Sequence, residues 1–107
     1  MKKAKILIVD DNELSRQNLS ELMTACGYDV KTVEDGREAM KAFLEDHYDI
    51  TITDLQMPHV DGLELLRFAK EMAPDHVVII ITGYGTVNNA VEAMKLGAFD
   101  FISKPLK

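Results

Sequence analysis

Apolar and polar positions alternate in blocks along the chain, and the blocks have the lengths of strands and helices. Residues 6–9, Ile-Leu-Ile-Val, form an uninterrupted apolar run of β-favouring residues, which is typical of a strand buried on both faces. From residue 13 to residue 25 the pattern is helical, with Leu19, Leu22, Met23 and Cys26 at three- and four-residue steps on one stripe, and Gly27 follows. This pattern predicts an amphipathic helix that ends at a C-terminal glycine cap.

The strand pattern recurs four more times. Residues 28–33 are more polar than the other strands and are expected at an edge of the sheet. Residues 77–81 are the most apolar and are expected at or near its centre. Residues 50–53 and 99–103 complete the set.

Helices are predicted between these strands. The second helix starts at Asp35-Gly36, the third follows Gly62 and stops at Ala73-Pro74, and the fourth ends at Gly97. Strands that alternate with helices of this length indicate right-handed βαβ units, so we predict a doubly wound α/β fold with a five-stranded parallel sheet. The second helix has an apolar face of Ala39, Met40, Phe43 and Leu44, and the third is expected to carry Leu63, Leu66, Ala69 and Met72 inward. The fourth has Val87, Ala90, Val91 and Met94 on one side.

Composition narrows the classes of function. The 107 residues fit one domain, and no apolar run approaches the ~20 residues that cross a bilayer. No signal peptide precedes the first strand, so the cytoplasm is the expected location. The net charge of −6 and the scattered Lys and Arg residues argue against nucleic-acid binding by the chain itself.

The cysteine and the histidines suggest no chemistry of their own. The single cysteine, Cys26, excludes an internal disulfide and is predicted to be a small buried hydrophobe on a helical stripe. His47 and His76 are predicted to be surface loop residues, and His59 is predicted to lie in a solvated loop.

The last predicted strand is not followed by a helix. A doubly wound sheet is normally covered by helices on both faces, so part of one face would lack its cover. We interpret residues 1–107 as one domain excised from a longer protein, and a short or reorganised domain is the alternative.

Polar side chains stand at the carboxyl ends of four predicted strands. Asp10 and Asp11 follow the first strand, Asp54 the third, Thr82 the fourth and Lys104 the fifth. In open parallel sheets ligands bind beyond these strand ends, so the five side chains are expected to converge on one edge. Three carboxylates in a small site raise one another's pKa unless a cation neutralises them.

The residue types in this set suit a hard metal ion and phosphate. Oxygen ligands without paired His or Cys favour Mg²⁺ before Ca²⁺, and Mg²⁺ typically binds one or two carboxylates together with water and phosphate oxygens. A carboxylate can attack a phosphoryl group and form an acyl phosphate. Lys104 and the metal would supply positive charge, and the Thr82 hydroxyl would donate a hydrogen bond.

Four stretches of the sequence closely resemble the receiver domains of bacterial response regulators. Taken together these stretches are highly specific, and the resemblance covers essentially the whole chain apart from a final helix. It implies a flavodoxin-like sheet with the strand order 2-1-3-4-5. The part from residue 82 to residue 101 is especially similar to the receivers of NtrC-type transcriptional activators. The stretches are Ile6–Asp11, Thr53–Pro58 with Asp61-Gly62, Ile81–Gly85, and Lys95–Pro105.

The resemblance implies a role for each carboxylate. Asp54 would accept a phosphoryl group from a phosphohistidine on a sensor histidine kinase. Mg²⁺ would be held by Asp11, Asp54 and the main-chain carbonyl of Gln56, with Asp10 assisting, often through water. The chain would catalyse its own modification without being a turnover enzyme.

The resemblance also implies a switch. Thr82 and Lys104 would hold the phosphoryl group, and the Lys104-Pro105 bond is expected to be cis. As Thr82 moves inward, the aromatic residue of the fifth strand, here Phe101, would follow it. Many relatives have Tyr at this position, and Phe101 lacks the Tyr hydroxyl, so only the packing of the ring would take part in the switch. The alternative is that Phe101 is a plain core residue. The implied output is transcription activation, with DNA contacted only through a module absent from this chain, and the resemblance allows a homodimer.

Other functions on a similar sheet fit less well. Phosphatases of the haloacid-dehalogenase type need a second Asp where Gln56 stands, and the P-loop pattern GxxxxGK[ST] is absent. A flavodoxin-like cofactor binder would carry a loop rich in Ser, Thr and Gly where Asp10-Asp11 stands. A docking module that works without phosphorylation, of the pseudo-receiver kind, is the remaining alternative, although no acidic residue of the set is missing.

Overall fold

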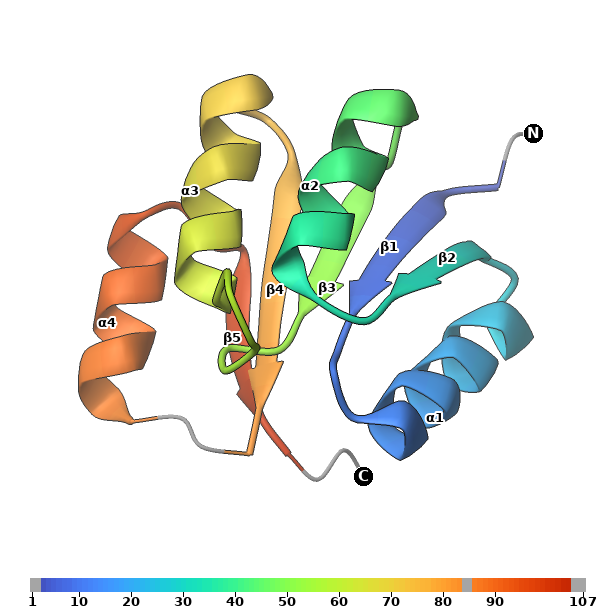
Figure 1. Cartoon of the computed structure of the whole chain (residues 1–107), viewed down its shortest axis with the longest axis horizontal. Helices are drawn as coiled ribbons and strands as arrows, with labels where there is room; N and C mark the ends of the chain where they lie inside the picture. The colour runs from blue at the N-terminus through green and yellow to red at the C-terminus, as the bar shows by residue number, and fades with distance from the viewer. Residues whose placement is uncertain (1–2, 84–85, 105–107) are drawn as a thin grey trace.

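The computed structural model describes residues 3–83 and 86–104, which form a five-stranded parallel sheet with helices on both faces (Figure 1). The strand order is β2-β1-β3-β4-β5, and all neighbouring strands pair in parallel. The predicted doubly wound α/β fold and its strand order are therefore confirmed. The polar strand β2 lies at an edge, and the apolar strand β4 lies next to the central strand, as predicted.

Strands and helices alternate along the chain with bounds close to those predicted. The strands are β1 (Lys5–Val9), β2 (Asp29–Val33), β3 (Ile50–Thr53), β4 (Val77–Thr82) and β5 (Asp100–Ser103). The helices are α1 (Glu13–Ala25), α2 (Gly36–Glu45), α3 (Gly62–Met72) and α4 (Val87–Lys95). Within the described ranges, no helix is long and apolar enough to span a membrane.

Each helix begins at a side chain that satisfies the backbone of its first turn. Asn12, Asp35, Asp61 and Thr86 are the N-cap residues, and each accepts a hydrogen bond from the backbone N–H three residues later. These residue types are the preferred N-caps because a short polar side chain reaches the free N–H groups of the first turn. The caps therefore fix where the chain leaves each strand end and enters the next helix.

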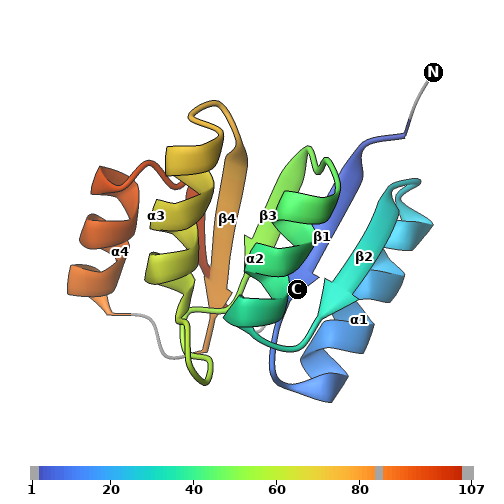
Figure 2. The same cartoon turned by 45° about the horizontal axis from the view of Figure 1, so that its top comes forward.

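The two faces of the sheet are covered unequally. Helices α2, α3 and α4 pack on one face, whereas α1 packs on the other (Figure 2). Successive residues of β1 alternate between the faces, as the pleat of a strand requires. Buried on the first face are Leu7, Val9, Leu65, Leu66, Val78 and Ile80, and on the second Ile6, Ile8, Leu19, Ile52 and Ile81.

The apolar stripe of α1 is less buried than predicted. Leu19 is buried, but Leu22 is 48% exposed, and Cys26 is exposed, so its predicted burial is wrong. One helix does not fill a face of five strands, and a groove of about 420 Å³ lies beside α1, where Leu22 borders it together with Ile52 and Ile81. Cys26 is the C-cap residue, at the point where the helix has ended.

The apolar side predicted for α4 is largely exposed. Val87, Val91 and Met94 are 79%, 47% and 50% exposed, whereas Ala93 is fully buried. The helix contacts the core through this small side chain, which leaves its larger apolar residues on the outside. Leu44, predicted on the apolar face of its helix, and Met72, predicted to face inward, are both exposed in the last turns of their helices.

His76 is buried, contrary to the prediction, whereas His47 and His59 are exposed as expected. Its ring nitrogen Nε2 lies 2.7 Å from the hydroxyl oxygen of Thr51, which is itself buried. The ring of Phe43 packs edge-on against the imidazole, with 4.9 Å between centroids. Thr51 looked like an ordinary strand residue in the sequence, so nothing marked the buried partner that holds His76.

We expect the burial of His76 to make folding sensitive to acid. Burial, followed by the charges of Lys70 and His47, lowers the pKa of His76 below its ordinary value of 6.5, against opposing contributions from Asp49 and the Tyr48 backbone. The unfolded chain therefore takes up this proton first as the pH falls. The contribution of His76 to the free energy of unfolding should decrease below pH 6.5 and stop decreasing once the pH is below the pKa of His76 in the folded state.

Urea unfolding at a series of pH values measures this dependence. Replacing His76 by Leu should remove the part of the pH dependence that comes from this histidine. It should also destabilise the protein at neutral pH by about 1–3 kcal/mol, because the buried Thr51 hydroxyl loses its partner. His59→Asn, at an exposed histidine that does not contribute to the pKa shift of His76, is the matched control and should keep the wild-type dependence. An unchanged dependence in His76→Leu would refute the assignment to His76.

Candidate phosphoryl and metal site

The turn after β1 is held by hydrogen bonds to every polar group of Asp10. Its carboxylate accepts from the backbone N–H of Asn12 at 2.9 Å, and its own N–H donates to the Val33 carbonyl at the end of β2. Its main-chain carbonyl accepts from the guanidinium of Arg16 at 2.9 Å. Asp10 itself is only 4% exposed, whereas Asp11 is exposed. The turn therefore buries one carboxylate and presents the next one to solvent.

Asp54 follows β3 directly. Its N–H donates to the Val9 carbonyl on β1, and one of its carboxylate oxygens accepts from the Leu55 N–H at 2.6 Å. Gly62 packs so closely beneath this turn that a Cβ there would overlap the main-chain oxygen of Asp54. A glycine at this position is therefore required by the shape of the Asp54 turn.

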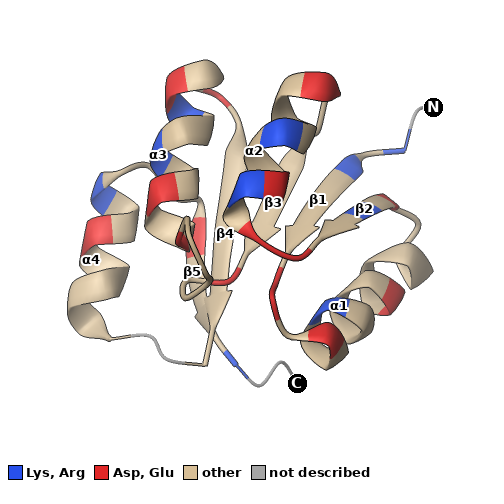
Figure 3. Ribbon diagram, in the orientation of Figure 1, with Lys and Arg blue, Asp and Glu red and all other residues tan. Residues whose placement is uncertain are grey.

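The structure brings the three predicted carboxylates together. One ligand oxygen from each of Asp10, Asp11 and Asp54 lies within 4.8 Å of the others, and this is the one such group among the described acidic, histidine and cysteine residues. Acidic segments follow β1 and β3 at the same edge of the sheet, near the basic segment that follows β5 (Figure 3). Oxygen ligands at this spacing are suited to Mg²⁺.

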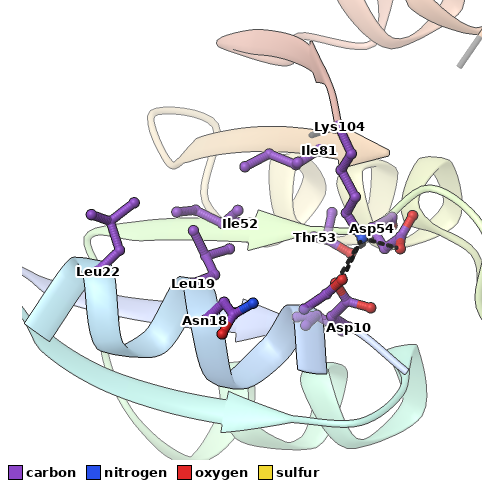
Figure 4. Close-up of a pocket in the computed structure, with 11 residues that line it drawn as sticks. Asp10, Asn18, Leu19, Leu22, Ile52, Thr53, Asp54, Ile81 and Lys104 are labelled. Atoms are coloured by element: carbon purple, nitrogen blue, oxygen red, sulfur yellow. Dashed lines mark hydrogen bonds and ion pairs between the residues drawn. The ribbon is translucent and has the colours of Figure 1, made fainter. Parts of the chain in front are cut away.

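Lys104 joins this cluster from the far edge of the sheet. Its Nζ lies 3.0 Å from Asp10 and 3.1 Å from Asp54, and so it bridges the two carboxylates (Figure 4). Burial tends to lower the pKa of Lys104, but its hydrogen bonds to Asp10 and Asp54 outweigh burial and raise the pKa above its ordinary value. The ammonium therefore stays charged at neutral pH and neutralises part of the acidic cluster.

The remaining predicted residues lie around this centre. Thr82 ends β4, is fully buried, and its carbonyl accepts from the Lys104 N–H. Gln56 lines an open cleft together with Asp11, Asp54 and Lys104. Phe101 is half-buried and pairs with Ile80, two residues before Thr82, so the two predicted switch residues point to the same face of the sheet. The predicted cis bond before Pro105 lies outside the described residues.

Two polar residues of the site were missed in the sequence. Ser15 lies in the first turn of α1, and its hydroxyl is 3.4 Å from Nζ of Lys104. Arg16 holds the Asp10 carbonyl, as described above. Both follow the Asp10-Asp11 pair by one helical turn, and that spacing was the only signal that could have found them.

Comparison with known proteins identifies the family. Residues 6–107 match the response regulator receiver domain. The chain belongs to the receiver family. The match contains four whole strands, β1 apart from its first residue, and the whole acidic cluster.

Receivers of transcriptional regulators are among the similar proteins. The C4-dicarboxylate transport transcriptional regulatory protein DctD of Pseudomonas aeruginosa is 41% identical over 101 residues, which are 94% of this chain and 22% of DctD. The transcriptional regulatory protein FixJ of Rhizobium meliloti is 45% identical over 101 residues, which are 94% of this chain and 49% of FixJ. This receiver thus spans about a fifth to a half of the curated relatives that it matches.

Solved structures agree with the fold in detail. The beryllofluoride-activated NtrC4 receiver domain dimer matches with a TM-score of 0.90 and 41% identity, covering 96% of this chain and 85% of that one. A response regulator receiver domain protein from Clostridium thermocellum matches with a TM-score of 0.92 and 40% identity, covering 97% and 84%. The predicted similarity to receivers of NtrC-type activators is confirmed.

Proposed function

We propose that this receiver is a phosphorylation switch in which Asp54 accepts a phosphoryl group from a phosphohistidine of a sensor histidine kinase. The observation that carries the proposal is the Lys104 ammonium, which lies within 3.1 Å of Asp54 and also contacts the buried Asp10. A cation held beside a strand-end carboxylate neutralises charge where an anionic phosphoryl group would arrive. A plain structural ion pair would not require the third carboxylate, Asp11, at the same place.

The donor set fits a magnesium ion. Three carboxylates with oxygens within 4.8 Å of one another supply the hard ligands that Mg²⁺ prefers. Asp11, Asp54 and the main-chain carbonyl of Gln56 would hold the ion, and Asp10 would assist. When bound, the ion supplies charge neutralisation for the phosphoryl oxygens.

The group transfer is a displacement at phosphorus. A carboxylate oxygen of Asp54 forms the new P–O bond while the P–N bond to the kinase imidazole breaks, and the imidazole leaves with the electron pair and takes up a proton. The product is an acyl phosphate on Asp54. Lys104, released from one carboxylate, pairs with a phosphoryl oxygen, and the Thr82 hydroxyl donates to another.

The output is proposed to pass through β4 and β5. Because Thr82 and Phe101 face the same side of the sheet, an inward shift of Thr82 changes the space available to the Phe101 ring. We propose that residues 1–107 act as the receiver part of a longer response regulator whose output is transcription activation. The names of DctD and FixJ, both transcriptional regulatory proteins, support this output.

A small acyl-phosphate donor tests the proposed function directly. Incubation of the chain with acetyl phosphate and Mg²⁺ should add the mass of one phosphoryl group, and EDTA should prevent the addition. Hydroxylamine should remove the group, because it cleaves acyl phosphates. A chain that binds no Mg²⁺ and takes up no phosphoryl group would instead support the alternative, a docking module that works without phosphorylation.

A second copy of the chain is proposed as a further partner. The similar NtrC4 receiver is described as an activated dimer, and α4 of this chain leaves Val87, Val91 and Met94 exposed on one side. Sedimentation velocity with and without beryllofluoride and Mg²⁺ should show a shift toward dimer on activation. A monomer under both conditions would remove this part of the proposal.

A further inference from the structure

The guanidinium of Arg16 contacts the main chain of the acidic turn, whereas Lys104 contacts its carboxylate. Arg16 belongs to the first turns of α1, and its side chain is only 15% exposed. Its Nη1 donates to the main-chain carbonyl of Asp10 at 2.9 Å, and its Nη2 lies 3.6 Å from the carboxylate of Glu34. Glu34 is 70% exposed, so the contact with the Asp10 carbonyl is the more sheltered of the two.

This contact acts on the peptide that carries Asp11. The Asp10 carbonyl and the Asp11 N–H belong to one planar unit, so fixing the direction of the carbonyl also fixes where the chain enters Asp11. In the part of the chain that the structure describes, the Asp11 carboxylate makes no hydrogen bond or ion pair of its own. Its position in the cluster therefore depends on the backbone before it.

We propose that Arg16 is a positioning residue for the divalent-cation site, acting through the Asp10-Asp11 peptide, an inference that rests on the proposed function. Its charge and its hydrogen bond have opposite effects on a bound cation. A positive charge near the acidic turn repels Mg²⁺, so removing the charge alone would tighten binding. Removing the hydrogen bond frees the peptide and lets Asp11 move, which would weaken binding. The sign of the change in affinity therefore separates the two effects.

We expect Arg16→Gln to weaken Mg²⁺ binding by about tenfold, the scale typical of lost outer-sphere partners of a metal site. Isothermal titration calorimetry with MgCl₂ on the unphosphorylated chain measures this affinity without any activity assay. Arg16→Lys keeps the charge and one donor and should recover part of the loss. Glu34→Gln removes the ion pair but leaves the carbonyl contact, and it should bind Mg²⁺ close to the wild-type value.

Arg67→Gln is the matched control, because it removes one exposed arginine from α3 and changes the net charge equally. Thermal unfolding confirms that each variant is folded at the titration temperature, and if Arg16→Gln is not, Arg16→Lys carries the comparison. Arg16 variants that bind Mg²⁺ as tightly as the wild type, or more tightly, would overturn the positioning role while leaving the proposed function intact. A wild-type chain that binds no Mg²⁺ would overturn both.

Discussion

Replacement of Asp54 by Asn is expected to abolish the uptake of a phosphoryl group from acetyl phosphate in the presence of Mg²⁺. The amide keeps the size of the side chain, but it lacks the anionic oxygen that forms the bond to phosphorus. The Leu55 N–H can still donate to the amide oxygen, so the turn after β3 should persist. Intact-protein mass spectrometry reads the outcome as the presence or absence of the added group.

Asp61→Asn is the matched control for this prediction. Asp61 lies seven residues later, and its side chain caps α3, a task that Asn performs equally well. This variant should label like the wild type. Full labelling of Asp54→Asn would reject Asp54 as the acceptor and direct attention to Asp10 or Asp11.

Replacement of Lys104 by Met is expected to change metal binding and phosphorylation in opposite directions. The ammonium competes with a bound cation for Asp10 and Asp54, so its loss should tighten Mg²⁺ binding several-fold. The rate of phosphorylation should nevertheless fall by about 10²–10³, the typical cost of removing one preorganised donor to a developing anion. Calorimetry and a time course of labelling measure the two effects separately.

The stability of this variant gives a further check. Without Lys104, the buried Asp10 carboxylate loses its cation, so Lys104→Met should be destabilised in EDTA and should gain more stability from Mg²⁺ than the wild type does. Lys95→Met, at an exposed lysine of α4, should change neither property. Labelling of Lys104→Met at the wild-type rate would contradict the role given to the ammonium.

Lys104 and Arg16 are both cations near the acidic turn, yet their removal is expected to change Mg²⁺ affinity in opposite directions.

The centre of the site could be predicted from the sequence because parallel strands end at one edge. That rule places Asp10, Asp11, Asp54 and Thr82 together without any knowledge of distances. Lys104 follows the same rule, although it is 94 residues from Asp10. What the rule does not give is which of the three carboxylates the lysine contacts, because that depends on side-chain reach across the end of β4.

The failures of the sequence analysis have two physical causes. Periodicity identifies an apolar stripe but not the partner that covers it, so it did not reveal that Leu22 and Val91 are exposed, on helices that bury fewer or smaller side chains. Contacts to main-chain atoms leave no trace in residue type, so only its spacing from the Asp10-Asp11 pair pointed to the bond from Arg16 to the Asp10 carbonyl. His76 is a further case of the first cause, since its burial depends on the side chains of Phe43 and Thr51 from two other elements.

The bridge made by Lys104 has a mechanical consequence for the outermost strand. Strand β5 is held to the rest of the sheet along one side only, by β4, and Lys104 is a second attachment that reaches past β4 to the ends of β1 and β3. One of the two anchor points of this attachment is the carboxylate that we expect to be modified. Modification of Asp54 therefore changes one of the contacts that hold an edge strand. A change confined to a few atoms thus reaches the edge of the sheet, where another protein surface can bind.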